Sequence, residues 1–413
     1  MNKKISLGVT VAVVLLAVSL TISGTMVLSM RHFSSLVSDV GQRQAMYDYI
    51  DEIDSAARKD YTIDEEKLRA ALANGYIDGL EDPYAAYLSA AEYQKVQSQL
   101  AGNRTGFGLV VTVKGTELIV SSVDENSPAA LSGIEKGNIV TAVDGETVTG
   151  ASYTLVQSKI NSSDKLILTV KQGETLTAVE LSSNTYTAVS VSGRLINNTI
   201  GYIRIREFNN ITPLQFKNVY NELTQQGAMY FLFDVRNNAG GKLSAVQEML
   251  DYLLPRGPYV DCQKKDELVT FSATDTYEMT APTVTLINGN TVGEAELFAG
   301  VLQDMSKTRL VGTSTQGKAV VQEYATIQSD KGAVRLSDGV LYRIHSGETW
   351  KDIGLIPDRT VDLAYDKQVY FDLLTDEEDT QLQAAIELLA SNTYLPVVNA
   401  EANKTTTAAT TAG

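Results

Sequence analysis

Lys318 and Gln322, together with residues 284–300, are the part of this sequence best suited to chemistry. Lys318 stands at the start of an apolar strand pattern, and the even spacing places Gln322 on the same face. A glycine-bearing turn at residues 289–293 leads into a helical pattern at residues 294–304. Backbone N–H groups at such a turn point toward a bound anion or oxyanion. We therefore expect a reaction or binding centre here.

The elements that must position these groups alternate along the chain. Apolar, β-branched runs predict buried strands at residues 199–208, 229–238, 284–288 and 308–313. Helical patterns separate them at residues 212–226, 242–254 and 294–304. This alternation predicts an α/β core, with a largely parallel sheet covered by helices.

The motifs around these elements resemble those of the C-terminal processing (tail-specific) serine peptidases, a family with a PDZ domain ahead of a serine–lysine peptidase core. That family carries N-x-G-S-A-S-A-S-E-I-x-A-G, followed by T-F-G-K-G-x-x-Q. The residues here that match in one ungapped register are Asn288, Glu296, Leu297, Ala299, Gly300, Thr315, Gly317, Lys318 and Gln322. In this register the family's catalytic serine falls on Gly293, so the nucleophile is missing.

The resemblance implies roles for the remaining site residues. DVRNNAGG at residues 234–241 resembles the family's D-x-R-N-N-P-G-G loop, with Ala239 in place of proline. It implies oxyanion-hole N–H groups from Gly240 (or Gly241) and from Glu294. In the family a desolvated lysine accepts the proton of the serine, and Lys318 is the retained half of that pair.

The acidic residue at position 294, where the family usually has alanine, permits two interpretations. Its carboxylate either lies beside Lys318, raising the pKa of the ammonium, or points to solvent from the first helical turn. Thr291, two residues before position 293, and Ser314, four residues before Lys318, are the hydroxyls considered as substitute nucleophiles.

Three functions stay open. The first is a peptidase homologue that has lost catalysis and binds peptides or protein C-termini. The second is an active serine-type endopeptidase with a non-standard nucleophile. The third is a scaffold that forms homo-oligomers through helical arms.

Residues 104–184 are identified as a PDZ domain. GFGLVV at residues 106–111 matches the carboxylate-binding loop and its strand, and residues 127–148 carry the S-P-A…G-I…G-N-I…V-D-G series. The resemblance implies a peptide-binding loop formed by Gly106, Phe107, Gly108 and Leu109. Glycines let the loop turn its N–H groups toward a terminal carboxylate, and the peptide then adds as a strand. Residues 152–160 would form the helix beside it.

The N-terminus predicts a membrane anchor. Residues 5–30 are 26 residues without a charge, and such a helix would span about 39 Å, more than a hydrocarbon core of about 30 Å. Lys3 and Lys4 precede it, which favours a cytoplasmic N-terminus. We expect residues 1–31 to be a cytoplasmic stub and transmembrane signal anchor, making this a single-pass cell-membrane protein with its bulk extracytoplasmic. A cleaved signal peptide is the competing interpretation.

The remaining segments complete the predicted domain organisation. Residues 32–103 have a helical pattern, and D-P-Y-x-x-Y-L at residues 82–88 is interpreted as part of a helical cap or dimer-forming arm without chemistry. Residues 185–392 form the peptidase-like core with a terminal helix. Residues 393–413 have low complexity and predict a disordered tail.

Composition excludes several classes of function. A net charge of −16 argues against nucleic-acid binding, which needs basic surfaces. Two histidines and one cysteine leave few soft ligands, so we expect no metal site and no cofactor. The single cysteine, Cys262, cannot form an intramolecular disulfide.

Overall fold

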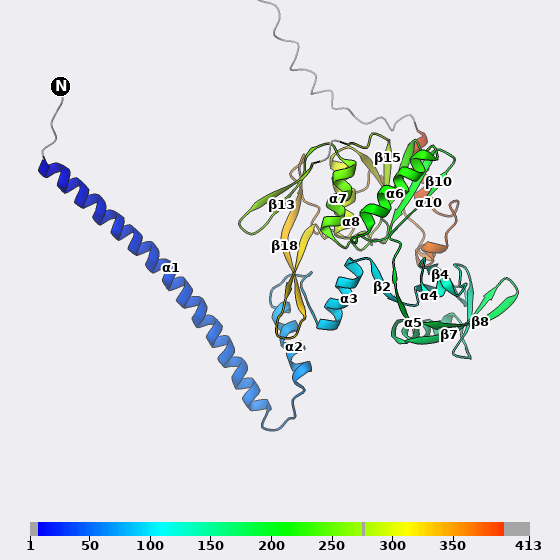
Figure 1. Cartoon of the computed structure of the whole chain (residues 1–413), viewed down its shortest axis with the longest axis horizontal. Helices are drawn as coiled ribbons and strands as arrows, with labels where there is room; N and C mark the ends of the chain where they lie inside the picture. Colours follow the sequence, from blue (N-terminus) through cyan, green and yellow to red (C-terminus); the bar gives the residue numbers. More distant parts are fainter. Residues whose placement is uncertain (1–6, 275–276, 392–413) are drawn as a thin grey trace, which may run out of the picture. The chain divides into compact units, whose positions relative to one another are not determined.

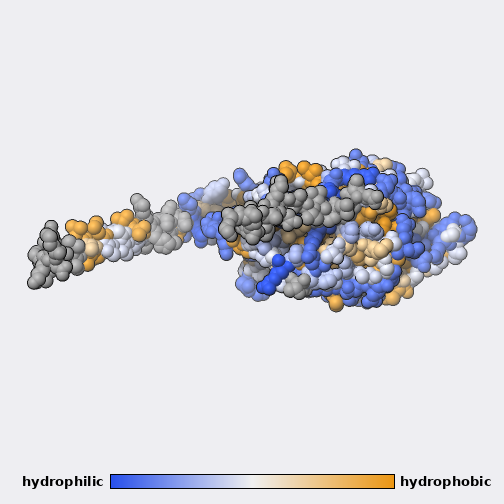
Figure 2. All heavy atoms as spheres, turned by 90° about the horizontal axis from the view of Figure 1, so that it is seen from above, coloured by the Kyte–Doolittle hydropathy of each residue, from blue (hydrophilic) through white to orange (hydrophobic). Residues whose placement is uncertain are grey.

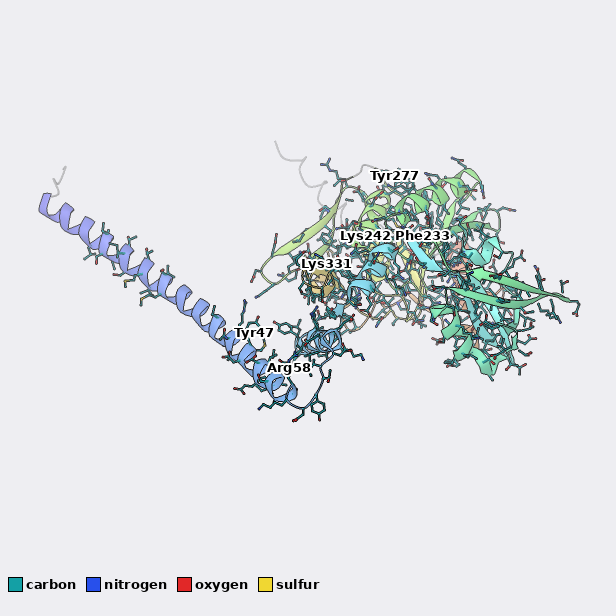
Figure 3. All side chains as sticks on the ribbon, turned by 60° about the horizontal axis from the view of Figure 1, so that its bottom comes forward. Tyr47, Arg58, Phe233, Lys242, Tyr277 and Lys331 are labelled. Carbon is teal, nitrogen blue, oxygen red and sulfur yellow. The ribbon has the colours of Figure 1, made fainter. Side chains whose placement is uncertain are left out.

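The computed structural model describes residues 7–274 and 277–391, and the chain divides into two compact units at residue 75 (Figure 1). The first unit contains α1 (Leu7–Ala57) and most of α2 (Glu65–Asp78). Arg58, labelled in Figure 3, follows α1, and its guanidinium pairs with Asp54 at 2.6 Å and Glu65 at 2.7 Å. Acidic residues in the first turn of α2 complement the helix dipole.

The expected transmembrane helix is wrong. Within the residues that the structure describes, no helix is both long enough and apolar enough to cross a membrane. The exposed apolar side chains of α1 between Leu16 and Met30 appear as orange spheres in Figure 2, interspersed with polar ones. Thr21 and Thr25 belong to the polar set, and each hydroxyl donates to a carbonyl one turn earlier.

The single-pass membrane location was inferred from that helix, and this prediction is therefore wrong as well. The flanking Lys3 and Lys4 lie outside the described residues, as does the tail from residue 393 that we expected to be disordered.

The second unit is built on a six-stranded sheet in the order β10-β11-β12-β15-β16-β19. β10 is antiparallel to β11, and every other neighbouring pair is parallel. The strands are β10 (Val191–Ile196), β11 (Ile200–Ile205), β12 (Tyr230–Asp234), β15 (Thr283–Ile287), β16 (Thr308–Gly312) and β19 (Arg359–Thr360). The helices of this core are α6 (Thr212–Gln225), α7 (Leu243–Leu253), α8 (Glu294–Asp304), α9 (Tyr365–Val369), η2 (Phe371–Leu373) and α10 (Thr380–Ala390).

Two apolar layers pack against the two faces of this sheet. Phe231 and Phe233 of β12 point into the larger layer, which contains residues of α6, α7 and α8. Leu232, between them, points into the other layer with Leu382 of α10. This alternation follows from the two-residue period of a strand. Figure 3 labels Phe233 among the crowded side chains of the core.

A second sheet has the order β1-β18-β13-β14, with β17 also paired to β18. Its strands are β1 (Ala86–Leu88), β13 (Gly257–Gln263), β14 (Leu268–Ala273), β17 (Val320–Thr326) and β18 (Ala333–Arg343). β1 lies in the region expected to be helical, between α2 and α3 (Ala90–Leu100). The helix is interrupted because Pro83 lacks an N–H, and because the Asp82 carboxylate accepts hydrogen bonds from the backbone of Tyr84 and from Ser337 of β18. Residues 86–88 therefore form a strand of the second sheet.

The PDZ-like part is entered and left through a two-stranded ladder, β2 (Asn103–Gly106) paired with β9 (Asn184–Thr187). Its sheet has the order β3-β4-β5-β7-β8, with β6 paired to β5. The strands are β3 (Leu109–Lys114), β4 (Glu117–Val123), β5 (Ile139–Val143), β6 (Glu146–Thr147), β7 (Lys165–Gln172) and β8 (Thr175–Ser182). Its helices are α4 (Pro128–Leu131), η1 (Gly150–Ser152) and α5 (Tyr153–Ser162).

Candidate active site

Gly293 forms the last residue of the turn between β15 and α8, and its backbone has φ of 59°. Glycine adopts this conformation without the steric cost that a side chain brings. A Cβ built on Gly293 would lie 3.5 Å from Cδ and 3.8 Å from Nζ of Lys318, which is ordinary contact distance. Position 293 therefore faces the lysine with room for a small side chain.

Lys318 lies just before β17 and is partly buried. Its ammonium donates to Oε1 of Gln322 at 2.5 Å, and Nε2 of Gln322 donates to the carbonyl of Tyr84 at 2.9 Å. The ring centre of Tyr84 is 5.7 Å from Nζ. The amide of Gln322 thus orients the lysine and ties it to the segment preceding β1.

Burial lowers the pKa of Lys318 below its ordinary value, although the nearby carboxylate of Glu294 acts in the opposite direction. The net direction is therefore the reverse of one alternative drawn from the sequence, in which Glu294 raised this pKa. Loss of hydration disfavours the ammonium more than one neighbouring carboxylate favours it.

Glu296, fully buried in the first turn of α8, connects the two chain segments of the site. Its carboxylate accepts from the N–H of Gly293 at 2.9 Å and from the hydroxyl of Thr315 at 2.6 Å. It also accepts from the N–H groups of Gly317 at 2.7 Å and Lys318 at 2.9 Å. Four donors satisfy a buried carboxylate, and here they hold position 293 opposite Lys318. The sequence match included Glu296 without assigning this role; its place in the helix's first turn is the capping-box signal that could have indicated it.

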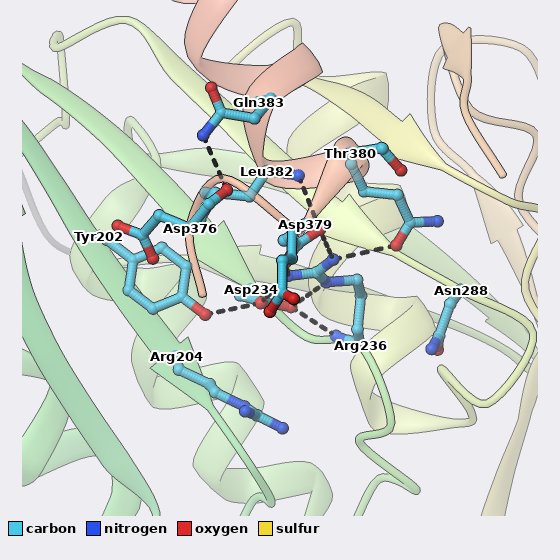
Figure 4. Close-up of polar contacts among 12 residues, drawn as sticks. Tyr202, Arg204, Asp234, Arg236, Asn288, Asp376, Asp379, Thr380, Leu382 and Gln383 are labelled. Carbon is cyan, nitrogen blue, oxygen red and sulfur yellow. Dashed lines mark hydrogen bonds and ion pairs between the residues drawn. The ribbon is translucent and has the colours of Figure 1, made fainter. Parts of the chain in front are cut away.

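The loop that follows β12 is held by buried charges (Figure 4). Arg236 donates to Asp234 at 2.6 Å and to Asp379, the N-cap residue of α10, at 2.7 Å. The hydroxyl of Tyr202 donates to Asp234 at 2.7 Å. Burial acts to raise the pKa of Asp234, but Arg236, Arg204 and the Tyr202 hydroxyl together outweigh it, and the net pKa is lowered. The D-x-R part of the loop motif is therefore structural, and it holds the base of the loop that leads to the glycine pair.

The glycine pair of this loop presents one N–H group to the site. The N–H of Gly240 donates to Oδ1 of Asn238 at 2.9 Å, within the loop itself. The N–H of Gly241 donates to Oε2 of Glu294 at 2.9 Å. Of the two glycines considered from the sequence, Gly241 is the one whose N–H faces the start of α8.

Glu294 is partly buried, so its side chain does not extend freely into solvent as the second alternative expected. Burial raises the pKa of its carboxyl group, while the N–H of Gly241 and the ammonium of Lys318 act to lower it. The carboxylate is therefore a constituent of the site.

A groove of about 880 Å³ opens onto this constellation. It reaches from the loop glycines Gly240 and Gly241 past Glu294 to Lys318, and it includes Arg335 of β18. The guanidinium of Arg335 donates to the carbonyl of Tyr84 at 3.2 Å. Neither Tyr84 nor Arg335 was recognised from the sequence; the D-P-Y motif was the available signal for Tyr84.

The two hydroxyls considered as substitute nucleophiles are placed differently from position 293. Thr291 is completely buried, and its hydroxyl donates to the carbonyl of Val235 at 2.9 Å and accepts from the N–H of Asn288 at 3.0 Å. That hydroxyl stabilises the turn. Ser314 is exposed in the segment between β16 and Lys318.

In the PDZ-like part, the predicted carboxylate-binding loop at residues 106–109 exposes its glycines partly and buries its apolar side chains. The side chains of Phe107 and Leu109 are 1% and 6% exposed and belong to the core. Gly108 has φ of 73°, and a Cβ there would lie 2.1 Å from Cβ of Ser127, so only glycine fits. β3 is an end strand of its sheet, and Val110 on it is 49% exposed.

The sheet-and-helix core and the PDZ-like part each match a known protein family. Residues 199–361 match peptidase family S41, and residues 95–171 match the PDZ domain. The chain is 26% identical over 305 residues to a "Probable CtpA-like serine protease" of Staphylococcus aureus strain N315, covering 72% of this chain and 61% of that protein. It is 26% identical over 313 residues to the carboxy-terminal processing protease CtpA of Bacillus subtilis strain 168, covering 73% of this chain and 67% of that protein. The chain thus spans about three-fifths to two-thirds of these relatives.

The crystal structure of a "Putative S41 protease from Bacteroides fragilis NCTC 9343" has the same fold. The TM-score is 0.58 at 17% sequence identity, with 77% of this chain and 90% of that chain covered.

Proposed function

Because this chain carries a peptidase family S41 domain and a PDZ domain, we propose that it is a catalytically impaired peptidase that binds peptides or protein C-termini without cleaving them. The observation that carries the proposal is the glycine at position 293. A Cβ built there would lie 3.8 Å from Nζ of Lys318, and glycine supplies no hydroxyl at that position. A serine–lysine pair needs that hydroxyl as its nucleophile.

The parts that remain suit binding better than turnover. Without the nucleophile, backbone donors and substrate binding give at most a residual acceleration over the uncatalysed reaction. The groove of about 880 Å³ is intact and is large enough for several peptide residues.

The PDZ domain supports binding of a chain terminus. β3 has a free edge in the sheet order, to which an extended peptide can add by main-chain hydrogen bonds. Gly106, with φ of 146°, precedes this strand, and exposed Val110 and Leu155 offer apolar surface on β3 and α5. Peptides with a free, apolar C-terminus are the expected ligands.

A cleavage assay on the full chain tests the catalytic half of the proposal. An unfolded protein substrate and a fluorogenic peptide with an apolar C-terminus are incubated with the purified protein, and new termini are sought by mass spectrometry. We expect none. Robust cleavage that Thr291→Ala or Ser314→Ala removes would instead establish an active peptidase with a different nucleophile.

A titration tests the binding half. A fluorescently labelled peptide is compared as free acid and as C-terminal amide, and amidation should weaken binding about tenfold or more, because charge-assisted hydrogen bonds to the carboxylate are lost. Val110→Asp on β3 should weaken binding of the acid form. Ile167→Asp, at a residue of β7 that is 44% exposed, is the matched control and should leave it unchanged. Equal affinity for the free acid and the amide would contradict the prediction that the loop at residues 106–109 binds a terminal carboxylate.

A further inference from the structure

One N–H group that the family arrangement leaves open for a substrate already has an occupant in this chain. Oε2 of Glu294 accepts the hydrogen bond of Gly241 N–H at 2.9 Å. This N–H is one of the donors expected at an oxyanion site, so the side chain lies where a substrate oxygen would lie.

The surrounding chain accommodates this carboxylate. A Cβ built on Gly240 would lie 2.4 Å from Oε2 of Glu294, so a side chain at position 240 would collide with it. Burial raises the pKa of the Glu294 carboxyl group, and the nearby Lys318 opposes that shift. The contact therefore combines a hydrogen bond from a backbone N–H, a nearby basic side chain and a close backbone approach.

We propose that Glu294 is an internal lock, a carboxyl group that occupies the N–H of Gly241 and competes with any peptide carbonyl for it. A peptide in the groove must displace this side chain before its main chain can reach this donor. The lock regulates the same site for which we proposed peptide binding, and its effect on affinity rests on that proposed function.

The charge of the groove indicates which probe to use. Its basic residues are Arg104, Arg206, Lys242, Lys318 and Arg335. Its acidic residues are Glu207 and Glu294. Displacing Glu294 leaves the groove with a marked excess of positive charge, which favours a peptide that carries a carboxylate side chain.

Amide hydrogen exchange at Gly241 tests the lock without any ligand. In the full chain, Glu294→Ala should speed exchange of this amide about tenfold or more, since it removes a hydrogen bond to a charged acceptor. Glu294→Gln keeps an oxygen acceptor without the charge, and should give a smaller increase. Glu207→Gln removes from the same groove a charge whose partner is Arg104 and not the Gly241 N–H, and should change the exchange less than about twofold. Unchanged exchange at Gly241 in a folded Glu294→Ala protein would overturn the proposal.

A binding measurement tests its consequence. The probe is an N-acetylated, C-amidated peptide of apolar residues with one central glutamate, which offers the PDZ domain no free terminus. Its affinity should rise about tenfold in Glu294→Ala and by less in Glu294→Gln, with Glu207→Gln as the charge control. An equal gain in Glu207→Gln would show a general charge effect and refute displacement. If exchange responds as expected but the peptide binds no variant, the lock stands and the proposed function fails.

Discussion

Restoring a hydroxyl at position 293 is the sharpest test of how this site is built. A Cβ at this position lies 3.8 Å from Nζ of Lys318, so the hydroxyl of Gly293→Ser, one bond further out, can approach the lysine to about 2.7–3.2 Å. The carboxylate of Glu294 holds the Gly241 N–H, and Glu294→Ala should therefore accompany the serine.

The expected magnitudes follow from the geometry. A serine with φ near 59° carries a strain of about 1–3 kcal/mol, which a domain stable by about 5–15 kcal/mol tolerates. Loss of one oxyanion donor costs about 10²–10³ in kcat. Gly293→Ser alone should therefore be about 100-fold slower than the double variant, in which the donor is free.

The assay is cleavage of a fluorogenic peptide with an apolar C-terminus, after circular dichroism has shown that each variant is folded. Adding Lys318→Ala should abolish the activity of the double variant. Because the base must be the neutral amine, activity should rise with pH and level off above the pKa of Lys318, which burial places below its ordinary value. Gly289→Ser, a serine in the same turn with open space around its Cβ apart from the Ser314 carbonyl at 3.9 Å, is the matched control and should stay inert.

Two results would refute this reasoning. A folded, inert double variant would mean that more than the nucleophile separates this chain from a working peptidase. Equal activity of the single and double variants would mean that Glu294 does not obstruct the oxyanion donors.

Three further predictions concern the framework of the site and are measured by urea unfolding. Glu296→Gln should lose about 1–3 kcal/mol, because its amide turns a donor toward N–H groups that need an acceptor; exposed Glu323→Gln should change little. Arg236→Met should lose about 3–5 kcal/mol by leaving two buried carboxylates unpaired, and a loss below 1 kcal/mol would contradict the role of that ion pair. The pKa of Asp82 is lowered, since backbone and Ser337 hydrogen bonds outweigh burial. The ionised Asp82 carboxylate contributes fully to the free energy of unfolding above about pH 4. This contribution is lost as the pH falls through the lowered pKa of the folded state. Asp82→Asn should therefore make the free energy of unfolding depend less on pH in the acid range.

Local patterns in the sequence were sufficient for the central elements. The apolar run at residues 284–288 predicted a buried strand, and β15 is buried along its whole length. The helical spacing at residues 294–304 predicted α8 with the same bounds. Both predictions depend on neighbours a few residues apart, whose periodicity is visible without the fold.

Long-range pairings were not visible in the same way. The D-P-Y segment has a helical neighbourhood on either side, yet Ala86–Leu88 pairs with β18 far along the chain, Ala86 with Arg335 and Leu88 with Ala333. Likewise, a long uncharged run predicted an anchor by its length, whereas no described helix meets the requirement for crossing a membrane.

The sequence by itself determined that position 293 is glycine and how far it stands from Lys318, Gln322 and the glycine loop, because residue identity and spacing along one chain carry that information. Only the tertiary structure decided what the other groups do. Glu296 joins two segments by accepting four hydrogen bonds, and Glu294 turns toward Gly241, 53 residues away. Burial, hydration and the direction of a side chain depend on which distant segments meet, and these set both the pKa of Lys318 and the acceptor of the Gly241 N–H.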